Sequence, residues 1–219
     1  MRKRARTVVT ILALTAAGLM RCEPMQAQKI VDQMVARVEN YIILQSDVQE
    51  LKQYQIFSDG KAEPDEQILS RLIDQWIVRN EATLSLFPQP SKEDVERSVD
   101  RLKKSFSSEV EYEDRKKQSG LTDDDITRLV RSQLFLSNYL DSRFRPTIQV
   151  DDKAIEQFYK TRVVPRAEAR KQTPPTLESA RDFIQEALVQ RAINQEADKW
   201  LKESRSRIHV QTFGDDTAK

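Results

Sequence analysis

The chain contains 219 residues, of which 38% are hydrophobic and 32% are charged, and its formal net charge is +1 at pH 7. Without residues 1–27 it loses five basic residues and one acidic residue, so the net charge becomes −3. This balance excludes the phosphate-binding surface that nucleic-acid-binding domains carry. The single histidine and the single cysteine exclude multi-histidine metal sites and zinc–thiolate sites.

The N-terminus has the three parts of a secretory signal peptide. Residues 2–6 are rich in Lys and Arg, residues 7–20 are apolar, and residues 25–27 form a small-residue cleavage site. The apolar part is shorter than the about 20 residues that a membrane-spanning helix needs. We therefore predict that residues 1–27 are a signal peptide cleaved near Ala27, and that the protein is periplasmic.

Two other fates of this leader stay open. It could be retained as an uncleaved anchor, or the chain could be lipidated at Cys22, although Arg21 does not fit the small residue expected before a lipidated cysteine. After cleavage near Ala27 no cysteine remains, so the exported chain would form no disulfide.

The segment after the leader predicts a β-ribbon followed by a helix. Apolar and polar side chains alternate in residues 34–38, residues 39–40 suit a turn, and residues 41–44 are β-branched, aromatic or aliphatic. Ser46 is expected to cap the following helix, with Asp47 in its first turn. A two-stranded ribbon is not stable alone, so it must pack on another part of the chain.

The rest of the chain is expected to be mainly helical. No glycine occurs in residues 121–213, although tight turns in β-rich domains commonly need it. Capping residues and prolines mark where helices begin and end. The expected helices span about residues 46–57, 64–87, 91–106, 108–119, 122–144, 151–159 and 176–204.

The last of these helices has two apolar faces. Its first half presents Leu177 and Ile184 on one side, whereas Ile193 and Trp200 in the second half lie well over 90° away. One helix should therefore pack against two different surfaces. The short alternating strand at 208–213 is expected to join the N-terminal ribbon as its third strand.

These observations predict a mainly α fold: a helical module with a small antiparallel sheet, formed by the N-terminal β-ribbon and the C-terminal strand. We expect a single module over residues 28–213, followed by a flexible tail at 214–219. Within the module, we expect an N-terminal segment at 28–161, a linker at 162–175, and a C-terminal helix and strand at 176–213.

The sequence contains no recognisable catalytic constellation. No GxGxxG, P-loop or GxSxG motif occurs, and His209 lies within the predicted last strand. The acidic runs at 123–125 and 151–152 fall at predicted helix N-termini, where carboxylates stabilise the helix. We therefore predict that the protein is not an enzyme and has no catalytic residue, cofactor or metal ion.

Several segments resemble the SurA-type periplasmic chaperones. The leader and the order and spacing of the segments carry this resemblance across nearly the whole exported chain. The segments are residues 35–48, 71–76, 81–82, 120–122, 131–134, 144–146, 150–152, 158–159 and 187–210.

This resemblance implies a helical core module that holds unfolded outer-membrane proteins in the periplasm. Most members of the family also carry parvulin prolyl-isomerase domains before the final helix. Here only about twenty residues separate Tyr159 from Ala180, whereas such a domain needs about a hundred. The resemblance therefore implies a chaperone without the isomerase domain.

The first functional hypothesis is an ATP-independent holdase that binds unfolded exported proteins, chiefly outer-membrane β-barrel proteins, in an apolar cleft. It implies no nucleic-acid partner and no stable membrane insertion after signal cleavage. Two alternatives are a non-catalytic adaptor that recruits another folding factor and, less favoured, a prolyl isomerase. The candidate client-binding residues are Phe135, Tyr139, Phe106 and Tyr112.

Phe135 and Tyr139 have two interpretations. They are four residues apart, on the side of their helix opposite its main apolar stripe. Either the helix is sandwiched and both of its sides are core, which we favour, or the two rings face a cleft.

Overall fold

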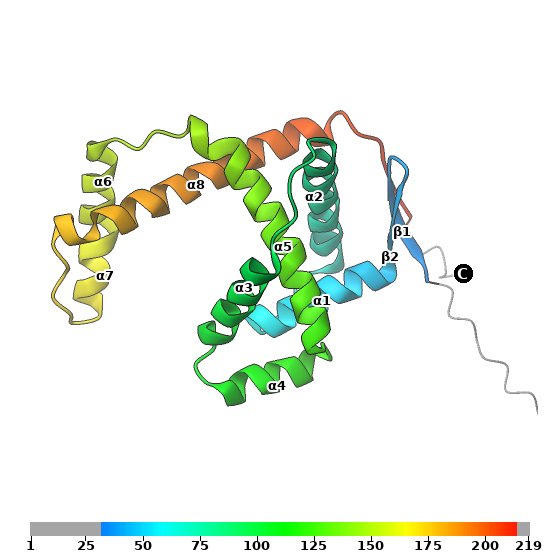
Figure 1. Cartoon of the computed structure of the whole chain (residues 1–219), viewed down its shortest axis with the longest axis horizontal. Helices are drawn as coiled ribbons and strands as arrows, with labels where there is room; N and C mark the ends of the chain where they lie inside the picture. The colour runs from blue at the N-terminus through cyan, green and yellow to red at the C-terminus, as the bar shows by residue number, and fades with distance from the viewer. Residues whose placement is uncertain (1–31, 214–219) are drawn as a thin grey trace, which may run out of the picture. The chain divides into compact units, whose positions relative to one another are not determined.

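A computed structural model describes residues 32–213 as a mainly helical fold with one small antiparallel sheet, as predicted (Figure 1). The predicted signal peptide, with its cleavage site and Cys22, and the tail at 214–219 lie outside the described residues. Among the described residues, no helix is long and apolar enough to cross a membrane.

The sheet joins the two ends of the described chain. Strand β1 (Met34–Val38) pairs antiparallel with β2 (Tyr41–Leu44) on one side and with β3 (Val210–Thr212) on the other, giving the order β2-β1-β3. Glu39 makes the turn with a positive φ of 53°. The predicted third strand is therefore confirmed.

The first five helices follow the ribbon. They are α1 (Gln45–Asp59), α2 (Asp65–Leu84), α3 (Lys92–Ser105), α4 (Glu109–Ser119) and α5 (Asp123–Phe144). The predicted caps of α3 and α5 are present, because the side chains of Ser91 and Thr122 accept hydrogen bonds from backbone N–H groups in the first turns of these helices. Gly60 and Gly120 end α1 and α4 in the left-handed conformation.

The prediction that Ser46 caps α1 is wrong. The helix begins at Gln45, directly after β2, and the Asp47 carboxylate accepts a hydrogen bond of 2.8 Å from the N–H of Leu44. The Ser46 hydroxyl instead donates to Asp32, before the ribbon. Helix α1 thus starts directly after β2, so Ser46 lies inside the helix and not at the position before its first residue, where a capping serine would lie.

The second half of the chain folds back along one long helix. A short 3-10 turn (Arg145–Thr147) leads to α6 (Asp152–Phe158), a π turn (Tyr159–Val163), α7 (Val164–Ala169) and α8 (Leu177–Arg205). With 29 residues, α8 is about 43 Å long. We call α6, the π turn, α7 and the first half of α8 the arm, residues 150–191, and α1 to α5 the body, residues 45–144 (Figure 1).

The prediction of two packing surfaces on α8 is confirmed. In the arm, Ala180 and Ile184 of α8 pack with Ile155 of α6. In the second half of the helix, Trp200 and Leu201 pack against the clusters of the sheet, α2 and α5. The protein therefore has several small cores rather than one large one.

The segment at 162–175, predicted as a linker, is helical in its first half. Helical structure continues to Ala169 despite Pro165, which has no N–H to donate. The preceding π turn accommodates this proline, since the N–H of Val164 reaches back five residues to the carbonyl of Tyr159. A proline that usually ends a helix here follows a widened turn.

Candidate binding pocket

The predicted client-binding residues lie in two separate cores. Phe135 and Tyr139 are 4% and 5% exposed, and Phe87 covers both rings with centroid distances of 5.9 and 5.5 Å. Helix α5 is therefore sandwiched, which confirms the interpretation that both of its sides are core.

The covering ring of Phe87 is held in place by the end of α2. The N–H of Phe87 donates to Ala82 at 2.9 Å, and that of Leu86 donates to Thr83 at 3.0 Å. Together with a φ of 52° at Leu86, these bonds form a Schellman-type helix end with leucine in the usual place of glycine. Helix α2 thus ends at Leu84, before the prolines at 88 and 90 that were expected to stop it.

The other two candidates belong to the core between α1, α3, α4 and α5. Tyr112 is 4% exposed, and it and the half-buried Phe106 pack on Phe57 with centroid distances of 5.4 and 5.3 Å. The fold brings each predicted pair together but keeps the two pairs apart. Client binding by these four residues stays a prediction, and it would require opening of the cores.

A pocket that the sequence did not predict lies on the arm. Its volume is about 770 Å³, and it lies between the π turn and α7 on one side and α8 on the other. Helix α6 and the π turn pack on α8, whereas α7 makes less contact with it, which leaves this space open. The lining residues are Phe158, Thr161, Arg162, Val163, Pro165, Arg166, Ala167, Arg170, Gln172, Pro175, Phe183, Ala187 and Arg191.

Local backbone structure shapes the far end of this pocket. Helix α7 ends in a second Schellman-type turn, in which Lys171 has a φ of 56° and the N–H of Gln172 donates to Ala167 at 2.9 Å. The Tyr159 hydroxyl donates to the carbonyl of Pro175 at 2.6 Å, and Thr176 then caps α8. Hydrogen bonds thus hold both ends of the loop between α7 and α8, which closes the pocket.

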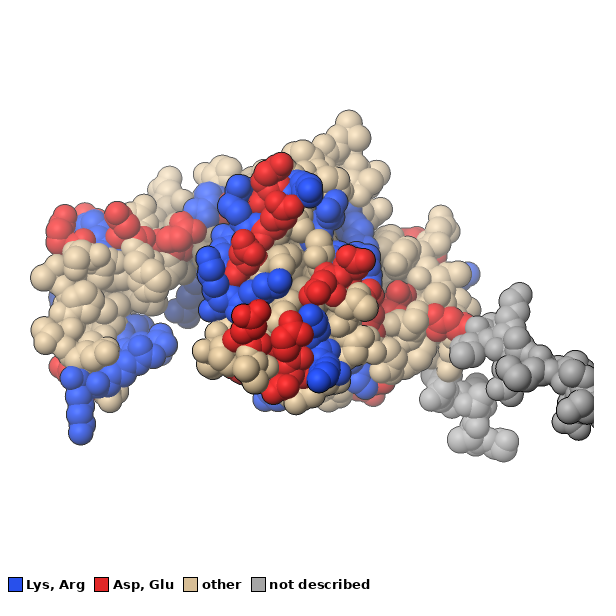
Figure 2. Space-filling view, turned by 60° about the horizontal axis from the view of Figure 1, so that its bottom comes forward, with Lys and Arg blue, Asp and Glu red and all other residues tan. Residues whose placement is uncertain are grey.

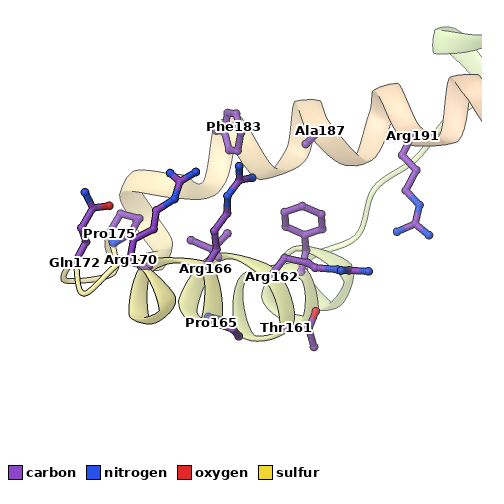
Figure 3. Close-up of a pocket in the computed structure, with 13 residues that line it drawn as sticks. Thr161, Arg162, Pro165, Arg166, Arg170, Gln172, Pro175, Phe183, Ala187 and Arg191 are labelled. Atoms are coloured by element: carbon purple, nitrogen blue, oxygen red, sulfur yellow. The ribbon is translucent and has the colours of Figure 1, made fainter. Parts of the chain in front are cut away.

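The pocket combines apolar walls with unpaired guanidinium groups. Arg166 and Arg170 extend from α7 toward α8, and Arg191 extends from α8 in the opposite direction (Figure 3). In the described part of the chain, the arginines whose side chains have no hydrogen bond, ion pair or ring contact are Arg131 and four that line this pocket: Arg162, Arg166, Arg170 and Arg191.

Arginines outside the pocket mostly have carboxylate partners. Arg181 pairs with Asp152 at 2.6 Å, and Arg145 pairs with Asp141 and Glu186, both at 2.7 Å. Acidic and basic side chains also alternate over the body in Figure 2, whereas basic side chains gather at the lower end of the arm. No acidic residue lines the pocket, so its guanidinium groups can take up an anionic ligand.

Ion pairs hold the arm to the end of α5. Hydrogen bonds from Arg145 and Gln190 lower the pKa of Glu186 to about 2, with those from Arg145 the larger cause. The pKa of Asp141 is lowered as well, chiefly by the Arg145 guanidinium. These carboxylates thus stay ionised at neutral pH and fix the position of α8.

A second hollow, of about 510 Å³, lies on the body beside α1 and α2. Its polar lining is largely satisfied internally, because Glu63 binds both Arg71 and Gln55. Within residues 32–213, no group of three or more His, Cys, Asp and Glu side chains could hold a metal ion. The pocket on the arm is therefore the stronger candidate for a binding site.

Comparisons with known proteins do not assign the chain to a family. No protein-family model matches the sequence, and no curated protein matches it.

Proposed function

We propose that this protein is an ATP-independent holdase of the periplasm that reversibly binds extended segments of unfolded exported proteins. The pocket on the arm carries this proposal. It is open and has apolar walls, with an accessible ring at Phe183, which is 72% exposed. Burial of apolar client side chains against such a surface is favourable and tolerates many sequences.

The distribution of the cores also supports reversible client binding. The arm has its own small core around Ile155 and Ile184, separate from the cores of the body. An element with few buried apolar contacts opens and closes at low free-energy cost, so it can adapt to different clients. The resemblance to SurA-type chaperones and the predicted signal peptide support the same function and the periplasmic location.

An aggregation assay tests this proposal. An unfolded outer-membrane β-barrel protein is diluted from denaturant, and its light scattering is followed with and without the full chain. We expect the wild type to suppress aggregation and Phe183→Ala to suppress it several-fold less, because the variant removes an apolar contact surface. The absence of suppression by the wild type would end the holdase proposal.

Val110→Ala is the matched control for this assay. Val110 is 71% exposed on α4 and does not line the pocket, so its truncation also removes exposed apolar surface without disturbing a core. If both variants lost activity equally, client binding would depend on general surface hydrophobicity rather than on the arm.

A further inference from the structure

We propose that the pocket on the arm selects acidic, amphipathic client segments, in which carboxylates alternate with apolar side chains. This inference rests on the proposed holdase function and adds a preference for one class of client. The observation behind it is that an apolar pocket is lined by Arg162, Arg166, Arg170 and Arg191. None of these four arginines has a partner in the described chain.

The arginines have the chemistry to recognise carboxylates. A guanidinium group presents a planar fork of donors that can bind both oxygens of a carboxylate, and it is always charged in proteins. The acidic residues nearest to these arginines in sequence are Glu156, Glu168, Glu186 and Glu196, and none of them lines the pocket. Glu156, Glu186 and Glu196 are paired with Lys160, Arg145 and Lys199. An incoming carboxylate therefore displaces no ion pair.

The spacing of the arginines favours an extended chain. Arg166 of α7 and Arg170, which directly follows the last residue of α7, are four residues apart, or about 6 Å along a helix at 1.5 Å per residue. Side chains on one face of an extended peptide are two residues, or about 6.6 Å, apart. Alternate residues of a bound strand can thus meet successive guanidinium groups.

The apolar walls suit the other face of such a strand. Phe158 and Val163 lie beside the arginines in the lining, and Phe183 and Ala187 contribute the α8 side. The residues between the carboxylates would pack on these side chains. This pairing of charge with apolar surface distinguishes the pocket from a purely basic patch, which would attract any polyanion.

A peptide-binding experiment tests the preference. The probes are three fluorescent nine-residue peptides in which Phe or Leu alternates with Glu, Gln or Lys, and binding to the full chain is measured by anisotropy. We expect the Glu peptide to bind about tenfold more tightly than the Gln peptide, and the Lys peptide most weakly. The advantage of the Glu peptide should shrink as salt rises from 0.05 to 0.5 M.

Arginine variants locate the effect. Arg166→Gln/Arg170→Gln should reduce binding of the Glu peptide about tenfold and leave the Gln peptide unchanged. Arg131→Gln is the matched control, since Arg131 is also exposed and unpaired in the described chain but lies on α5 outside the pocket. An equal loss in this control would overturn the pocket as the source of selectivity.

The outcomes separate the inference from the proposed function. Suppressed aggregation with equal affinity for the three peptides would overturn the acidic preference and leave the holdase proposal intact. Failure in the aggregation assay together with no peptide binding would overturn both. Binding of phosphatidylglycerol vesicles through Arg166 and Arg170, with no binding of the Glu peptide, would replace the client by an anionic lipid surface.

Discussion

Arg145 joins the body to the arm through two carboxylates. Its guanidinium group donates two hydrogen bonds to Glu186, at 3.0 and 2.7 Å, and further bonds to Asp141. This bidentate geometry makes the contact stronger than the single ion pairs common on protein surfaces. The arm should therefore be sensitive to protonation at this contact.

We expect acid to weaken this contact. Because the pKa of Glu186 is lowered in the fold from an ordinary value of 4.5 to about 2, its contribution to stability is present above pH 4.5 and is lost as the pH falls toward 2. Glu186→Gln should reduce the free energy of unfolding at pH 7 and bring the variant closer to the wild type near pH 2. Urea unfolding at a series of pH values measures this difference.

Asp182→Asn is the control for the acid effect. Asp182 lies one turn earlier on α8 and has no ion pair or side-chain hydrogen bond within the described chain. Its variant should keep the pH profile of the wild type. A constant difference between wild type and Glu186→Gln across this pH range would contradict the ion-pair explanation.

At the level of helices and turns, the arm has a hydrophobic core of its own and is joined to the body mainly through surface contacts. Its core contains Ile155, Ala180 and Ile184 with partly buried neighbours from the arm alone. The arm is joined to the body mostly by hydrogen bonds at the surface, which involve Arg145 and Gln190. The arm should therefore lose its structure before the body does.

Truncation of Ile184 tests this separation. Ile184 is fully buried in the core of the arm, so Ile184→Ala should cost about 2–5 kcal/mol of local stability. We expect faster hydrogen exchange in α6, α7 and the first half of α8, with α1 to α5 unchanged. Uniformly faster exchange throughout α1 to α5 would show that arm and body unfold together.

The neighbouring Phe183 supplies the control for this experiment. Because Phe183 is mostly exposed, Phe183→Ala should leave hydrogen exchange nearly unchanged while it weakens client binding. Substitutions at these two adjacent residues of α8 therefore test two properties separately: the stability of the arm and client binding in the pocket.

The element boundaries show where sequence reasoning fails. Capping motifs such as Thr122 with Asp125 are local in sequence and were predicted correctly. The helix ends at Leu86 and Lys171 were missed, because neither residue is the glycine that usually takes a positive φ. Helix α7 was missed since Pro165 predicts a break unless the preceding turn is known to be widened.

For the molecule as a whole, the sheet determines how the described chain closes. Val210 of β3 lies opposite Val38 of β1 and packs with the cluster formed by the sheet and α2. Strand β1 would otherwise present an unpaired edge, which favours aggregation. The C-terminal strand therefore completes the module.

Val210→Asp should destabilise this closure by about 2 kcal/mol, because it places an unpaired charge against apolar side chains. Gln211→Glu is the matched control. Gln211 is exposed on the other face, where it accepts a hydrogen bond of 3.1 Å from Arg37, so a carboxylate there should be tolerated. Thermal unfolding of both variants gives the comparison, and equal midpoints would contradict the role of β3.

The sequence predicted an apolar binding surface, but it predicted neither the place of the pocket nor the arginines that line it. Aromatic residues at 135 and 139 indicated apolar contacts, and the structure places these contacts in a core beneath Phe87. Arg162, Arg166 and Arg170 lie in the segment that the sequence predicts as a linker, and Arg191 lies in α8. Their position around one pocket depends on helix α7 and on the return of α8 beside it, which brings together residues distant in sequence.

The sequence by itself determined the helical class, most helix starts, the two faces of α8 and the third strand, because caps and apolar periodicity act over a few residues. Only the tertiary structure decided which apolar faces are covered and which stay open. Phe87 closes one surface of α5, whereas α7 stands away from α8 and leaves the pocket. Such coverage depends on how distant segments meet, which local patterns do not encode.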